Sequence, residues 1–427
     1  MSNENIISKE VKDLENLDKT LPKNYLPTVG FANFAIYMAL MTPVLVSLAF
    51  KLEHITKSQA AATAAQGTVL GLGALCAAIV NPIAGRLSDR TTSKFGMRRP
   101  WIAGGAVAGF IGLLMIGVAQ SVPVVILGWC ITQTAFNASL AALNVTVADT
   151  VPMAKRGIVS GFIGVMFPAG VLIGTILVRA IATDLPRFLI PATTALIGLL
   201  LFAFFFKDRV LPKSQKVPFD FKTLIGTFYF NPKKNPDFAW VVITKFIFMT
   251  GYAGIASYLP FFVTSRFHLD EKEALNIITL STTVSTILLA VSSFIGGWIS
   301  DKVGKRRPLV MAAGIIVAIG LAILAVAPSP GWVVFAQAIS GFGTGAYLSV
   351  DLALATSTLP SEDEAAKDLG IFNLANALAQ SVAPAVAPGI IALGAAAAIG
   401  GYGVFFLVGA LFVLIGSITI YQVKSIA

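Results

Sequence analysis

The chain has 427 residues, of which 56% are hydrophobic and only 12% are charged, and its net charge is +10. Soluble proteins carry about twice this share of charged residues, roughly 25%. A soluble protein of this length could not bury so much uncharged sequence in a core and still cover its surface with polar groups, so ordinary soluble enzymes are excluded. The expected fold class is an all-α membrane protein.

Long uncharged stretches predict the membrane-spanning helices. They cover residues 58–85, 101–148, 274–300 and 308–350, and one crossing needs about 20 apolar residues. Taken in chain order, the sequence predicts twelve transmembrane helices in two six-helix bundles. Their approximate centres are Tyr37, Gly71, Phe110, Gln133, Val165, Ile197, Gly251, Thr286, Val317, Gly341, Ala379 and Phe406. Pro168 in the fifth helix, and Pro384 and Pro388 in the eleventh, predict breaks.

A hydrophilic stretch divides the chain almost at its midpoint. Residues 207–237 hold seven basic and three acidic residues, which predicts a linker. The expected organisation is a tail over residues 1–26, a bundle over 27–206, a second bundle over 238–422 and a short tail over 423–427. The first tail lacks the apolar segment of a signal peptide.

The basic residues predict the orientation of the helices. The loops at 86–99, 155–156, 207–237 and 301–307 fall on one side of the membrane, and all are basic. Because Lys and Arg collect in cytoplasmic loops, we expect both termini in the cytoplasm and the protein in the plasma (inner) membrane. The same placement argues against a nucleic-acid partner. The expected partners are the lipid bilayer and a small-molecule substrate, and the expected state is a monomer.

One motif occurs at the same place in each half, after the second helix. Its residues are Gly85, Asp89, Arg98 and Arg99 in the first half, and Gly297, Asp301, Arg306 and Arg307 in the second. Two halves related by a parallel repeat are typical of transporters that expose one site to each side in turn. We expect the motif to latch the two halves together on the cytoplasmic side. Alternatively, its arginines only fix the topology.

Residues 85–100 (GRLSDRTTSKFGMRRP) resemble the loop signature of the major facilitator superfamily, and more narrowly that of sucrose–proton symporters and the related glycoside–pentoside–hexuronide cation symporters. Residues 41–43 are similar to the Leu-Thr-Pro of their first helix, and Asp149 with Arg156 resembles the Ala-Asp…Arg that ends their fourth. The resemblance implies the major facilitator fold and proton-coupled symport of a di- or oligosaccharide or glycoside. It also implies that Asp149 takes up the proton while Arg156 competes for its carboxylate. Alternatively, the two form an inconsequential surface salt bridge.

Two charged residues lie deep within predicted helices of the second half. Lys245 is about 10 Å from the helix start near Phe238, and Asp351 is about 13 Å from the helix end near Pro360, at roughly 1.5 Å per residue. Ionisable groups inside a membrane are costly unless they are paired. We therefore expect an intramembrane ion pair, which could be a fixed staple or a gate.

Uncharged polar residues recur at helical spacing in three further helices, and aromatic residues accompany them. The candidate substrate-binding residues are Tyr37, Gln133, Asn137, Asn144, Tyr252, Gln337, Thr344, Tyr347, Asn373, Asn376 and Gln380. Carboxamides both donate and accept hydrogen bonds, which suits a hydroxyl-rich ligand. Alternatively, these residues merely hold the helices together.

Several functions are disfavoured by what the sequence lacks. There is no phosphate-binding Gly-rich loop followed by Lys-Ser/Thr, and His54 and His268 are too isolated to suggest a metal site. We therefore expect no catalytic residues, no cofactor and no metal, and a protein that is not an enzyme. The alternatives to sugar–proton symport are a proton-driven exporter of drugs or metabolites, an uncoupled sugar facilitator, and a membrane sensor.

Overall fold

The computed structural model describes residues 22–212, 231–304, 306–359 and 365–424, and within these ranges the regular structure is entirely helical. The first half contains α2 (Tyr25–Thr42), the π-helical turn η1 (Pro43–Ser47), α3 (Leu48–Thr56), α4 (Gln59–Ser88), α5 (Arg99–Val118), α6 (Val122–Thr150), α7 (Met153–Arg179) and α8 (Asp184–Phe205). The second half contains α10 (Pro236–Phe267), α11 (Glu271–Val303), α12 (Arg306–Ala325), α13 (Pro330–Ser357), α14 (Ala365–Leu393), α15 (Gly400–Thr419) and the 3-10 turn η3 (Ile420–Gln422).

The predicted transmembrane helices are confirmed. Within the described residues, 12 helical segments are long and apolar enough to cross a membrane, with α2, η1 and α3 forming the first. The predicted breaks are wrong, because α7 runs through Pro168 and α14 runs through Pro384 and Pro388. Neighbouring helices can support a proline inside a membrane helix without a break. The first span is interrupted instead, where the wider π turn begins at Pro43.

Local sequence explains where several helices begin and end. The Ser58 hydroxyl accepts a hydrogen bond from the Ala61 N–H at the start of α4. At the start of α11, Asp270 and Glu273 form a reciprocal capping box, with distances of 2.7 and 3.2 Å. Gly304 ends the same helix in the left-handed region at φ 67°, where a residue without a Cβ avoids strain.

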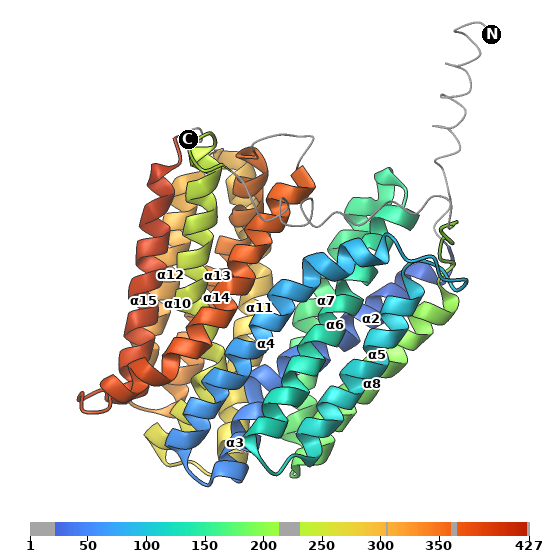
Figure 1. Cartoon of the computed structure of the whole chain (residues 1–427). Coiled ribbons are helices and arrows are strands. Elements are labelled where there is room, and N and C mark those ends of the chain that lie inside the picture. The colour runs from blue at the N-terminus through green and yellow to red at the C-terminus, as the bar shows by residue number, and fades with distance from the viewer. Residues whose placement is uncertain (1–21, 213–230, 305, 360–364, 425–427) are drawn as a thin grey trace, which may run out of the picture.

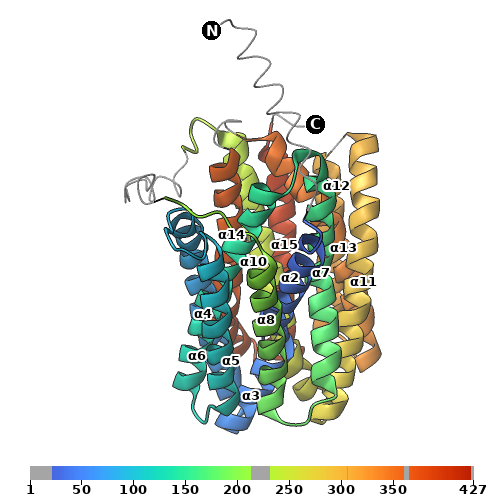
Figure 2. The same ribbon diagram turned by 90° about the vertical axis from the view of Figure 1, so that its right-hand side faces the viewer.

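The helices form two bundles, one from each half of the chain, that lie side by side (Figures 1 and 2). The bundles meet where α4 packs on α14 and α7 packs on α11. We call this boundary the seam. The helix end at which α2 begins and η3 ends is called the termini end, and the opposite end is called the far end. Large apolar side chains such as Phe294 and Phe204 are exposed on the outer helix faces, as expected of helices surrounded by lipid.

The seam is tightest in the half of α4 nearer the far end. A Cβ added at Gly67 would lie 2.7 Å from the Pro384 carbonyl oxygen of α14, and one at Gly71 would lie 3.1 Å from the Ala385 Cβ. Glycine therefore allows the two backbones to touch. Toward the termini end the axes of α4 and α14 diverge (Figure 1), so the described conformation is closed at the far end.

Candidate functional site

A pocket of about 410 Å³ lies between α2, α6 and α7 of the first bundle, and it contains several predicted residues. Tyr37, Asn144, Arg156 and Ser160 supply its polar groups. The rings of Tyr37 and Phe167 meet edge to face with centroids 5.1 Å apart. The pocket therefore combines aromatic rings, a carboxamide, a hydroxyl group and a guanidinium group.

Close contact between α7 and α2 positions the two rings. A Cβ at Gly170 would lie 2.7 Å from the Phe34 carbonyl oxygen, so only glycine permits this approach. Gly174, one turn further along α7, faces Thr42 in the same way. Two glycines four residues apart lie on one helix face, and they place Phe167 against Tyr37.

Arg156 does not pair with Asp149 in the described conformation. The Arg156 guanidinium donates hydrogen bonds to the Val151 carbonyl oxygen at 3.0 Å and to the Ala148 carbonyl oxygen at 2.8 Å. Carbonyl groups at the end of α6 lack helical partners and carry partial negative charge, so they attract the guanidinium. Asp149 pairs with a different arginine, Arg98.

Arg98 joins two carboxylates at the termini end of the first bundle. Its guanidinium forms ion pairs with Asp89 and, at 3.3 Å, with Asp149, and it donates to the Ser88 hydroxyl at 2.6 Å. The Arg98 side chain is 4% exposed, whereas the Asp89 and Asp149 side chains are 53% and 46% exposed. A Cβ at Gly85 would touch nothing. Asp149 therefore combines access to water with a buried cationic partner.

Asp208 holds the start of α5 beside this arginine. One carboxylate oxygen accepts the backbone N–H groups of Arg98 at 2.5 Å and of Arg99 at 2.8 Å. Gly96 has a φ of 107° and contacts Asp208 where any Cβ would clash. Burial raises the pKa of the Asp208 carboxyl above 3.8, and the two backbone hydrogen bonds oppose that rise. This residue lies in the predicted linker, where only charge composition was considered.

The second copy of the motif also contacts its own bundle. Arg306 donates to the Ala353 carbonyl oxygen at 2.7 Å, and the Arg307 Nε is buried without a hydrogen-bond partner among the described residues. Gly297 is half-buried on α11, and the Asp301 side chain lies outside the described residues. In both copies, no contact found for the described motif residues crosses the seam.

The structure brings together Lys245 and Asp351 inside the second bundle. Lys245 Nζ lies 2.5 Å from Asp351 Oδ2, and 3.9 Å from the centre of the Phe372 ring. Tyr347 stacks on Phe248 with centroids 3.7 Å apart, and its hydroxyl lies beside Asp351 without hydrogen-bond geometry. Tyr347 therefore contributes to the packing around the pair.

The polar residues predicted on the fourth helix divide into two groups. Asn137 accepts a hydrogen bond from Asn81 at 3.1 Å and donates to the Gln133 side chain at 2.8 Å. Its polar atoms therefore join helices of the first bundle to one another. Asn144 is exposed and lines the pocket, so it remains a candidate for substrate contact.

The polar residues of α13 are mostly buried. Gln337 is 8% exposed and Thr344 is 2% exposed, and the Thr344 hydroxyl donates to the Ser340 carbonyl oxygen at 2.7 Å. Tyr252 of α10 is half-buried beside Thr344. The Thr344 bond lies within α13, and the Tyr252 contact joins α10 to α13 in the described conformation.

The polar residues of α14 lie at the seam. Asn373 and Gln380 are exposed, and Asn376 is half-buried. Asn373, Gln380 and Pro384 fall at intervals of seven and four residues, which places them on one helix face. Because Pro384 touches Gly67 of the other bundle, this face is directed at the first bundle.

A charged cluster at the far end was not predicted from the sequence. It contains Lys51, His54, Asp184, Arg187 and Glu271. The residues belong to three helices of both bundles. Both signs of charge in the short far-end loops were the available signal, but charge in a loop indicates topology and not which residues pair.

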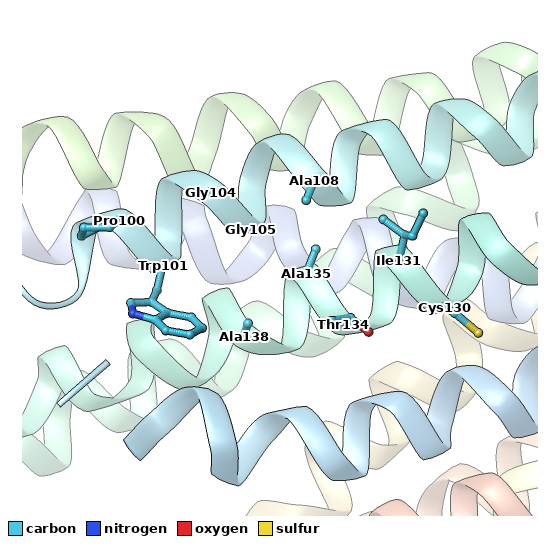
Figure 3. Close-up of a pocket in the computed structure, with 10 residues that line it drawn as sticks. All are labelled: Pro100, Trp101, Gly104, Gly105, Ala108, Cys130, Ile131, Thr134, Ala135 and Ala138. Carbon is cyan, nitrogen blue, oxygen red and sulfur yellow. The ribbon is translucent and has the colours of Figure 1, made fainter. Parts of the chain in front are cut away.

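A larger pocket, of about 500 Å³, lies between α5 and α6 and has different chemistry (Figure 3). It is lined mainly by Gly, Ala, Ile, Pro and Trp side chains, with Thr134 and Cys130 as the more polar members. No charged side chain reaches it, and both helices belong to one bundle. This pocket is therefore not the candidate transport site.

The sequence profile of the Major Facilitator Superfamily matches residues 29–285 and 273–421. The chain belongs to this superfamily. It is accordingly a multi-pass membrane transporter and not an enzyme.

Individual relatives are named for different transported compounds or activities. A stretch of 57 residues is 46% identical to the sucrose transport protein SUC4 of Arabidopsis thaliana, covering 13% of this chain and 10% of that protein. The multidrug resistance protein MdtG of Citrobacter koseri is 25% identical over 255 residues, covering 58% of this chain and 59% of that protein. This transporter thus aligns with less than two thirds of either curated relative.

Solved structures share the fold. A mutant of the nucleoside transporter NupG superposes with a TM-score of 0.74 at 16% identity, covering 93% of this chain and 98% of that chain. At this identity the similarity concerns the arrangement of helices alone.

Proposed function

We propose that this transporter moves a sugar, either a di- or oligosaccharide or a glycoside, together with a proton by alternating access. The observation that carries the proposal is the pocket in which Tyr37 and Phe167 lie beside Asn144 and Ser160. Aromatic rings can stack on the apolar face of a sugar ring. The carboxamide and hydroxyl groups can donate to and accept from its hydroxyls.

The face of α14 that is directed across the seam offers the matching half of such a site. Asn373 and Gln380 are exposed there, and neither side chain forms a hydrogen bond that we find among the described residues. Bringing the bundles together at the termini end would place these carboxamides opposite the pocket. The substrate would then bind between the halves, as in other transporters built from repeats.

Asp149 is our proposed proton site, with Arg98 rather than Arg156 as its partner. Arg98 pairs with Asp89 through Nη2 and with Asp149 through Nε, so the two carboxylates share one cation. Protonation of Asp149 removes the negative charge that attracts Arg98, which leaves the arginine to Asp89. Such a shift would change the contact between α5 and α6 at the termini end and couple protonation to bundle movement.

We also propose that the termini end faces the cytoplasm, because its loops are the basic ones. The described conformation is then open to the cytoplasm. The motif residues around Arg98 and Arg306 would latch the two bundles together in the opposite conformation, in which the termini end closes.

The similarity to MdtG favours a second candidate, a proton-driven exporter of drugs or metabolites. The two proposals differ in cargo and in direction, but share the scaffold. The carboxamide, hydroxyl and guanidinium groups in the pocket favour sugar, whereas an exporter of apolar compounds would be expected to use apolar and aromatic side chains alone.

Uptake into proteoliposomes would test the proposal. A panel of labelled saccharides would be offered with and without an imposed pH gradient, using liposomes without protein as the control. Sugar–proton symport predicts accumulation of a di- or oligosaccharide or glycoside above its equilibrium level only when the gradient is present. Equilibration without accumulation would indicate an uncoupled facilitator. If no sugar is transported and apolar cations move with the proton gradient instead, the proposal is contradicted and the exporter is favoured.

A further inference from the structure

His54 lies between carboxylates of the two bundles at the far end. Its Nδ1 is 3.0 Å from Asp184 Oδ1 of α8, and its Nε2 is 3.1 Å from Glu271 Oε2 of α11. His54 and Asp184 belong to the first bundle and Glu271 belongs to the second. The imidazole ring therefore bridges the seam.

Two further cations hold these carboxylates in place. Lys51 Nζ lies 3.2 Å from Asp184 Oδ2 and donates to the Gly117 carbonyl oxygen at 3.1 Å. The Arg187 guanidinium forms an ion pair with Glu271. Arg187 is 2% exposed and Lys51 is 4% exposed, whereas the His54 side chain is 45% exposed. The ring is thus the member of the cluster that protons from the far-end compartment reach most directly.

The protonation state of His54 decides how many bridges it can make. A carboxylate only accepts hydrogen bonds, and neutral imidazole donates from one ring nitrogen alone. Both observed contacts can be hydrogen bonds at once only if the ring is the doubly protonated cation. Loss of the proton removes one of the two bonds of His54, which is either its link across the seam to Glu271 or its link to Asp184.

Counting Glu53 with the five residues of the cluster, the positive and negative groups are equal in number only when His54 is protonated. Glu53 on α3 lies close to both His54 and Glu271. With His54 protonated, there are three positive and three negative groups. The positive groups are Lys51, His54 and Arg187, and the negative groups are Glu53, Asp184 and Glu271. Three other helices, α4, α6 and α10, pack on α3. The charged residues of α4 and α6 lie at the termini end. Near the far end, Arg266 of α10 and His268, which follows that helix, form no ion pair among the described residues.

We infer that His54 is a proton-binding site at which acid in the far-end compartment holds the two bundles together at that end. Protonation of the ring stabilises the described conformation, and deprotonation favours opening of the far end. The inference is independent of the sugar and of Asp149, because it concerns only the equilibrium between the two conformations.

Spin labels on either side of the seam would measure this equilibrium without any substrate. Cys76 and Cys130 would be replaced by alanine, and cysteines introduced at two exposed positions outside the cluster, Ala182→Cys before α8 and Lys272→Cys on α11. Pulsed electron–electron double resonance of the full-length protein in nanodiscs would give the distribution of distances between the two labels. Measurements would run from about pH 5 to about pH 8.5, which brackets the pKa of free imidazole, about 6.5.

The ratio of short to long distances should fall roughly two- to fivefold as the pH rises, the range expected for a partly exposed ionic contact. In His54→Gln the ratio should be low and independent of pH. In His54→Arg, a permanent cation that can reach two carboxylates, it should stay high at every pH. His268→Asn is the matched control, since His268 lies at the same end with left-handed backbone that asparagine tolerates, and it should behave like the parent.

Three outcomes would overturn the inference. They are an unchanged pH response in His54→Gln, a parent protein whose distances do not respond to pH, and loss of the response in His268→Asn alone. Gel filtration of each variant would establish that it is folded before its distances are compared.

Discussion

Lys245 and Asp351 form an ion pair with a separation of 2.5 Å between α10 and α13, and both side chains are less than a tenth exposed. The Phe372 ring of α14 lies against the ammonium group. Three helices of the second bundle therefore meet at one pair of charges, and removal of either partner leaves a buried charge without compensation.

Single neutralisation of this pair should destabilise the protein more than double replacement. Lys245→Met or Asp351→Leu alone should lower the free energy of unfolding by about 3–5 kcal/mol, whereas the double variant should recover most of this loss. Thermal unfolding in detergent would measure the order. Transport by a stable double variant would identify the pair as a staple, and a stable but inactive double variant would identify it as a gate. Equal destabilisation by all three variants would contradict the pairing.

Asp149→Asn should abolish accumulation of the substrate and spare exchange. The asparagine cannot release a proton, so uptake should fall to the level seen without a pH gradient, while exchange of internal for external substrate continues. Asp89→Asn is the variant for comparison, because it keeps the proposed proton site but removes the carboxylate that would retain Arg98. Loss of accumulation in both variants would assign the effect to the Arg98 contacts as a whole, and unchanged accumulation in Asp149→Asn would exclude the site.

Two asparagines of α6 should respond differently to alanine. Asn144 lines the pocket without a described hydrogen bond, so Asn144→Ala should raise the KM for the substrate about two- to tenfold with little change in stability. Asn137 is bonded to Asn81 and Gln133, so Asn137→Ala should lower the free energy of unfolding by about 1 kcal/mol and change KM less. Concentration-dependent uptake and thermal unfolding would separate the two effects, and the reverse pattern would contradict the assignment of Asn144.

Asp208→Ala should loosen the start of α5, at a cost of about 1 kcal/mol, because two backbone N–H groups lose their acceptor. Asp208→Asn keeps an acceptor oxygen and should be close to the parent. The native carboxyl has a raised pKa and binds its proton more tightly than the unfolded chain does. Its contribution to the free energy of unfolding is therefore largest at acid pH and falls as the pH rises through the pKa of the native carboxyl. Thermal unfolding between acid and neutral pH should show this fall in the parent and not in Asp208→Asn.

The helices could be predicted from the sequence because lipid leaves few choices. An uncharged run of sufficient length must cross as a helix, and each predicted centre lies in a span of the structure. The contact of Lys245 with Asp351 could be anticipated for a similar reason, since two opposite charges at equal depth have few other partners. The continuity of α7 through Pro168 depends instead on neighbouring helices, which the local sequence does not reveal.

The rest of the candidate site depends on contacts between distant segments. Arg98 reaches Asp149 only because α5 begins where α6 ends, and Asp208 reaches the start of α5 from beyond α8. Helical spacing placed Asn137 and Asn144 on one face. It could not show that Asn137 is hydrogen-bonded to Asn81 and Gln133 while Asn144 remains exposed. His54 gave no periodic signal, because its partners come from other helices.

The backbone contact of Gly67 with Pro384 is one of several contacts that must separate when the far end opens. Polar bonds also resist separation at that end. They join Gln59, Thr63 and Gln66 of α4 to the second bundle, and His54 and Arg187 to Glu271. Bonds between partly exposed charges weaken as dissolved salt increases. The ionic strength of the far-end compartment should consequently tune turnover, and a cell that meets changing salinity would change its transport rate without making more protein.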